Sequence, residues 1–71
     1  MAEEIRAEMV ANVLIVHVEE GQTVTPGQQV VILESMKMEI PVLAEAGGVV
    51  ARISVGAGDV VQEGDVMVEL S

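Results

Sequence analysis

The chain has 71 residues, a formal net charge of −9, and neither cysteine nor any aromatic residue. This length suits one domain near the lower size limit for unaided folding, and the lack of cysteine excludes disulfides and thiolate metal sites. The acidic excess disfavours nucleic acid and anionic membrane as partners, because phosphate-rich surfaces would be repelled.

The apolar residues are mostly branched aliphatics, with fifteen valines, and these fit a pleated sheet better than a helix. We therefore expect an all-β fold. The acidic opening segment lacks the basic residues of a signal peptide, and no apolar run approaches the ~20 residues that span a bilayer, so a cytoplasmic location is expected. One histidine and no glycine-rich phosphate loop leave little for nucleophilic or metal chemistry, and we expect no enzyme acting alone.

In chain order, the first predicted elements are an alternating strand at Glu4–Met9 and a strand-turn-strand unit at Val13–Leu33. Both recur 37 residues later, as Pro41–Ala46 and Val50–Leu70. The match includes glycines at the same turn positions, where the backbone often needs a positive φ. We predict a single domain, residues 1–71, built from two repeat halves at about 4–36 and 41–71.

Turn signals separate the short alternating runs at a spacing typical of a small sandwich or barrel. They lie at Glu19–Gln22, Thr25–Gln28, Val55–Asp59 and Gln62–Asp65.

The repeat also predicts which side chains face the core, because positions that stay apolar in both copies should point inward. The pairs expected inside are Leu14/Ala51, Val16/Ile53 and Val18/Val55, and those expected outside are Ile15/Arg52 and His17/Ser54. A metal-ligand role for His17 is not expected, since no second ligand is near it in the sequence.

One segment does not fit a single strand. From Val30 to Leu43 there is no glycine, and fourteen residues greatly exceed a typical strand of five or six. The second copy begins near Pro41, so the chain must reverse between Leu33 and Pro41. The reversal falls on residues 36–38, Met-Lys-Met, although tight hairpins usually recruit pairs such as Asn-Gly. Departures from such local rules are frequent at functional sites.

Lys37 in this segment is the only lysine of the chain. One interpretation is structural: an edge lysine blocks aggregation, and the methionines beside it fill gaps in the core. The other is a chemical handle, because a unique primary amine makes a modification selective. An exposed lysine is protonated at neutral pH, and Glu34 and Glu39 favour that form. The lysine would therefore be an acceptor on which another enzyme acts, rather than a nucleophile in its own right.

The stretch "ESMKMEI", central in a two-fold repeated valine-rich chain and followed by "VGAGDVVQEGD", resembles the biotinyl domain of biotin-dependent carboxylases, especially the small free-standing biotin/lipoyl attachment proteins. The likeness spans Ile5 to Leu70. It implies a flattened β-barrel of two four-stranded antiparallel sheets with a pseudo-two-fold axis, the modified lysine on an exposed hairpin, and the termini at the far end.

The resemblance assigns covalent biotin to Lys37 and recognition by a biotin protein ligase to Met36 and Met38, with Glu34, Ser35 and Glu39 as flanking hairpin residues. The carrier would shuttle carboxybiotin between biotin carboxylase and carboxyltransferase subunits. Its acidic surface would either steer docking or only maintain solubility.

Two alternatives remain open: a lipoyl carrier domain, and an unmodified all-β interaction module. Lipoyl domains typically carry Asp-Lys-Ala at this turn, so the two methionines favour biotin. The chain departs from the family pattern at Ser35, where alanine is commonest, and at Gln22, where the second copy has Asp59. It also lacks the protruding insertion of some carboxylase carriers.

Overall fold

A computed structural model describes residues 3–71 and contains eight β-strands. No helix in this part of the chain is long and apolar enough to span a membrane. The strands are β1 (Glu3–Arg6), β2 (Ala11–Val16), β3 (Thr23–Val24), β4 (Gln29–Ser35), β5 (Met38–Leu43), β6 (Gly48–Ile53), β7 (Val60–Val61) and β8 (Val66–Leu70).

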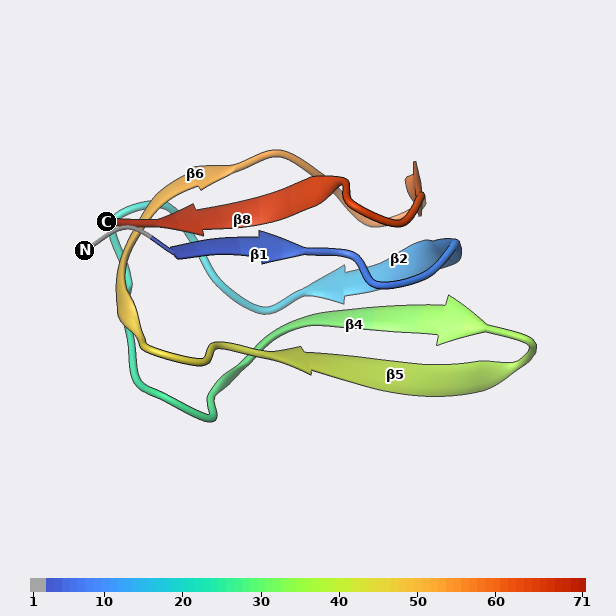
Figure 1. Ribbon diagram of the computed structural model, residues 1–71, viewed down its shortest axis with the longest axis horizontal. Helices are drawn as coiled ribbons and strands as arrows, with labels where there is room; N and C mark the ends of the chain where they lie inside the picture. Colours follow the sequence, from blue (N-terminus) through green and yellow to red (C-terminus); the bar gives the residue numbers. More distant parts are fainter. Residues whose placement is uncertain (1–2) are drawn as a thin grey trace.

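The strands form two four-stranded antiparallel sheets, in the orders β1-β8-β6-β3 and β5-β4-β2-β7 (Figure 1). Each sheet takes two strands from each half of the sequence. An offset of 37 residues converts one sheet order into the other. The predicted all-β fold of two four-stranded sheets with internal two-fold symmetry is therefore confirmed.

Backbone hydrogen bonds between the halves obey the same offset. Gly21 N donates to Val50 O at 2.8 Å, and its counterpart Gly58 N donates to Val13 O, also at 2.8 Å. Both glycines have positive φ, +90° and +95°, a conformation that residues with a Cβ rarely adopt. The repeated glycines are thus needed where the two halves exchange backbone bonds.

The predicted turns are also present, and a side chain caps each of them. Gln22 Oε1 accepts from Glu19 N at 3.1 Å, and at the equivalent turn Asp59 Oδ2 accepts from Gly56 N at 2.8 Å. The glutamine at Gln22 therefore performs the same capping role as the aspartate of the second copy. The remaining two turns have equivalent caps, from Gln28 and from Asp65.

The predicted core face is wrong at one pair of positions. Ala51 is exposed and Leu14 only half-buried, whereas Val13 and Val50 are each 1% exposed. The cause is a register shift in the strand pairing between Val13 and Ile15, and another between Val50 and Arg52. Each β-bulge adds one residue and so resets the inside-outside alternation.

The other predicted faces are confirmed. Val18 is buried, its partners on the inner face pack against the core, and the four residues expected outside are exposed. The partners are Val16, Ile53 and Val55; the outer residues are Ile15, Arg52, His17 and Ser54.

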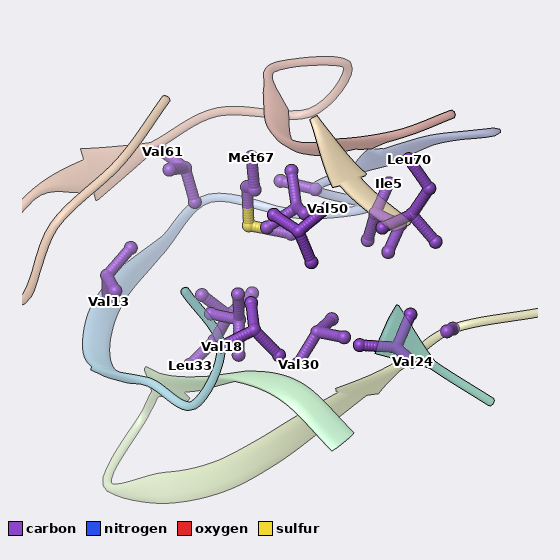
Figure 2. Close-up of a cluster of buried hydrophobic side chains, with 14 of the residues drawn as sticks. Ile5, Val13, Val18, Val24, Val30, Leu33, Val50, Val61, Met67 and Leu70 are labelled. Atoms are coloured by element: carbon purple, nitrogen blue, oxygen red, sulfur yellow. The ribbon is translucent and has the colours of Figure 1, made fainter. Parts of the chain in front are cut away.

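The core lies between the two sheets and is entirely aliphatic apart from methionine. Figure 2 shows Met67, Val50 and Leu70 on one side of it, directed toward Val30 and Leu33 on the other. Val30 and Met67 occupy equivalent places in the repeat, and both are 0% exposed. Close packing of this kind holds the β4–β5 hairpin, whose tip extends beyond the core.

The molecule is elongated, with extents of 33 × 18 × 17 Å. The β4–β5 hairpin forms one end, and the C-terminal residue Ser71 lies at the other, beside the start of β1 (Figure 1). A side chain at the hairpin tip is therefore remote from both ends of the described chain.

Candidate functional site

The candidate site is the two-residue turn between β4 and β5. Ser35 and Met38 are paired across the strands, so Met36 and Lys37 alone make the reversal. Their φ angles are +53° and +65°, as a type I′ turn requires at both central positions. Met38 is the first residue of β5, which shortens the predicted turn of residues 36–38 by one residue.

This backbone conformation is unfavourable for residues other than glycine, asparagine and aspartate. The left-handed region costs an L-residue with a Cβ roughly 1–2 kcal/mol. Regular pairing of β4 with β5 from Val31–Val42 to Ser35–Met38, including Leu33 with Ile40 at the core, holds the turn in place. Backbone strain of this kind is found at functional sites and persists where the surroundings determine it.

The turn presents its side chains to solvent. Met36 is 91% exposed and Met38 64%, and Lys37 is exposed as well. Within residues 3–71 Lys37 makes no ion pair, whereas Arg6 pairs with Glu4 at 2.6 Å. The lysine amine is thus accessible and unengaged by the described chain. The methionines do not fill a core gap, which removes that part of the structural interpretation.

Two carboxylates stand directly behind the turn. Glu34 on β4 is paired with Glu39 on β5, and like charges at opposed positions of a sheet destabilise it. Glu34 and Ser35 are half-buried, and Glu39 is exposed. The hairpin therefore has one positive charge at its tip, on Lys37, and two negative charges on the paired strands behind it, on Glu34 and Glu39.

The described residues offer no second chemical centre near the tip. His17 directly follows β2 and is exposed, as predicted. No group of three or more potential metal-ligating side chains occurs among residues 3–71. What this arrangement can do chemically is present one primary amine to an acylating enzyme.

One neighbouring feature was not anticipated from the sequence. A shallow groove of about 150 Å³ lies beside β5, where Ile40 and Pro41 face Glu8 and Met9 of the β1–β2 connection. The sequence predicts a strand that runs to Met9, whereas β1 ends at Arg6 and Met9 lies in the connection to β2. A comparison of the two copies could have indicated the groove. Ile40 and Pro41 are apolar, whereas the equivalent residues of the first copy, Glu3 and Glu4, are acidic.

Residues 3–70 match the biotin/lipoyl family model, described as "Biotin-requiring enzyme". The chain belongs to this biotin/lipoyl family. Among its relatives is a biotinylated protein TB7.3 homolog of Mycobacterium leprae, 55% identical over 71 residues, which are the whole of both chains. The biotin/lipoyl attachment protein of Bacillus subtilis is 48% identical over 67 residues, covering 94% of this chain and 92% of that one.

The same biotin/lipoyl fold occurs inside much longer polypeptides. The crystal structure of Kluyveromyces lactis urea carboxylase superimposes on the whole chain with a TM-score of 0.92 and 31% sequence identity, and the match covers 6% of that enzyme. Members of the biotin/lipoyl family thus include both free-standing proteins of this size and small parts of a carboxylase.

Proposed function

We propose that this protein is a biotin carrier and that Lys37 is the residue that receives the biotin. The main support for this proposal is the geometry of the β4–β5 turn, where a strained type I′ backbone presents the only lysine. The lysine side chain is exposed and makes no ion pair within residues 3–71. Residues 1–71 would act as one carrier unit.

Biotin is favoured over lipoate by two independent observations. The relative that matches over the full length of both chains is named a biotinylated protein. Met36 and Met38 flank the acceptor where lipoyl domains typically carry aspartate and alanine. They are 91% and 64% exposed, so both side chains are available for recognition by a biotin protein ligase. A flexible thioether side chain adapts well to an apolar pocket on such a partner.

In the attachment step, Lys37 Nζ attacks the acyl carbon of biotinyl-adenylate. A C–N amide bond forms, the bond from that carbon to the AMP oxygen breaks, and AMP leaves. The ammonium must first lose its proton, so the ligase supplies the base. Formation of the amide removes the positive charge at the tip and leaves the anionic pair of Glu34 and Glu39 unbalanced.

Attached biotin supplies a ureido ring that accepts and releases a carboxyl group. The chain itself contributes a tether, which replaces diffusion of a free cofactor with a high local concentration at two successive sites. Biotin carboxylase and carboxyltransferase subunits would be the partners. The carboxylates of Glu34 and Glu39, paired behind the turn, would attract a basic surface on such partners. Salt screens this attraction and should therefore slow docking.

The test is biotinylation of Lys37→Arg beside the unchanged chain, each incubated with a biotin protein ligase, ATP and biotin, and each read by intact mass and by fragmentation across residues 34–40. Arginine keeps the charge but cannot be acylated by this route. We expect the mass of one biotinyl group on Lys37, none on the variant, and the same thermal midpoint for both within about 2 °C, since an exposed residue is changed. Label on the variant, or no label on either chain, would contradict the proposal.

A further inference from the structure

Two grooves lie between the unpaired edges of β1 and β5, and the 37-residue offset relates them. The one nearer the hairpin, the hairpin groove, has a volume of about 150 Å³, and the other, the terminal groove, about 180 Å³. The hairpin groove is lined by Met9, Leu33, Ile40 and Pro41, and the terminal groove by Glu3, Glu4, Ile5 and Glu45; both share Arg6, Glu8, Val42 and Leu43.

The terminal groove already holds a carboxylate of its own chain. The two carboxylate oxygens of Glu3 accept hydrogen bonds from the backbone N–H groups of Glu45 and Ala46, each at 3.0 Å. These adjacent N–H groups thus form a pair of hydrogen-bond donors at the groove, and the Glu3 carboxylate is their acceptor.

At the hairpin groove the corresponding N–H groups belong to Glu8 and Met9. Their surroundings match, because Ala7 and its counterpart Ala44 make equivalent backbone bonds to the neighbouring turns. Within residues 3–71, however, neither N–H has a hydrogen-bond acceptor from the chain. The reason is that Ile40 stands where the other copy has Glu3, and isoleucine has no acceptor to offer.

We propose that, once Lys37 is biotinylated, its arm folds back along β5 and the cofactor rests in the hairpin groove. The ureido carbonyl oxygen accepts from Glu8 N–H and Met9 N–H, in the place that Glu3 takes in the terminal groove, and the bicyclic ring packs against Ile40 and Pro41. This inference rests on the proposed function and adds a resting position for its cofactor.

The arm is long enough. Ile40 lies three residues from Lys37 along β5, a distance of about 10 Å at ~3.4 Å per residue. About eleven bonds of the lysine stem and the valeryl chain separate the Cα of Lys37 from the biotin ring. An extended chain advances ~3.3 Å for every three bonds, so this arm spans about 12 Å.

The contact is also weak enough to be released. The N–H groups of Glu8 and Met9 belong to exposed residues, so water replaces the ureido oxygen at little cost. Apolar contact with Ile40 and Pro41 adds attraction for the ring, while the groove remains open to solvent. A partner enzyme can therefore withdraw the cofactor into its own site.

The experiment compares backbone amide resonances and amide hydrogen exchange of the unmodified and biotinylated chains. Intact mass confirms one biotinyl group on the sample. We expect shift changes at residues 8, 9 and 40 in addition to the turn, and exchange at Glu8 and Met9 slowed about fivefold, the effect of one ordinary hydrogen bond. The variant Ile40→Glu recreates the terminal groove with its own carboxylate and should lose these effects. The control Ile15→Glu, at a 48% exposed site on β2, should keep them.

The outcomes separate the two proposals. A chain that a biotin ligase does not label overturns the proposed function and this inference with it. A labelled chain in which the changes stop at residues 35–39 overturns this inference alone, whatever the fold of Ile40→Glu. Equal loss of the effects in Ile15→Glu would also overturn it.

Discussion

The positive φ of Met36 gives a stability prediction that separates the backbone of the turn from its side chain. Replacement by glycine removes the clash of a Cβ in the left-handed region, worth roughly 1–2 kcal/mol. It also adds unfolded-state entropy that costs about 0.5–1 kcal/mol. Met36 is 91% exposed, so loss of its side chain removes little buried area. The net expectation for Met36→Gly is a stabilisation of about 0.5–1 kcal/mol.

The assay is thermal and urea unfolding of the unmodified chain, followed by circular dichroism. For a chain of this size the stabilisation corresponds to a rise of about 3–6 °C in Tm. The matched control is Met36→Ala, which keeps the Cβ and therefore the strain, and should unfold within about 2 °C of the unchanged protein. A second control, Met38→Gly in β5, should lower stability by about 0.5–1 kcal/mol, because glycine weakens a strand interior.

Unfolding of Met36→Gly at a lower temperature than the unchanged chain, or an equal gain in stability for Met36→Ala, would refute the role of backbone strain. If the prediction holds, a slower biotinylation of the more stable Met36→Gly would assign the methionine to recognition by the ligase rather than to folding.

Two further predictions concern the hairpin sequence and the close approach of the chain to its C-terminus. Met36→Asp combined with Met38→Ala should slow biotinylation by about tenfold, equivalent to ~1.4 kcal/mol in the transition state, and admit lipoylation by a lipoate ligase; an unchanged rate would mean that the methionines are not read. Gly48→Ala should destabilise by about 2–3 kcal/mol in urea unfolding, because its Cβ would lie 2.5 Å from the backbone oxygen of Ser71. Gly21→Ala, with φ +90° but nothing within 4 Å of the added Cβ, should cost only about 1 kcal/mol; equal costs would contradict the steric argument.

The position of the hairpin follows from the sequence because two patterns agree on it. The 37-residue repeat requires a reversal before Pro41, and the length of Val30–Leu43 forbids one continuous strand. The type I′ geometry was not predictable from residue type, because Met36 and Lys37 are poor formers of such a turn. There the pairing of the flanking strands overrides local preference.

The bulges account for the error in the core. Val13 and Leu14 are both aliphatic, as are Val50 and Ala51, so hydrophobicity alone does not reveal which one points inward. Bulges depend on backbone pairing with the neighbouring strand. The repeat reproduced the mistake in both copies, because both copies contain the same bulge. The groove beside β5 was missed for a related reason, since it is formed by segments that the sequence does not show to be neighbours.

The pairing of β1 with β8 has a consequence for how such a carrier is built into larger proteins. Glu3 opposes Leu70 just as Ile40 opposes Leu33. The pair β8–β1 is therefore equivalent to the β4–β5 hairpin, except that no turn joins its two strands. A polypeptide that enters at β1 or continues from Ser71 would do so at the pole opposite the tip. Fusion there would attach the carrier through a linker and leave the β4–β5 hairpin, with Lys37 at its tip, unchanged.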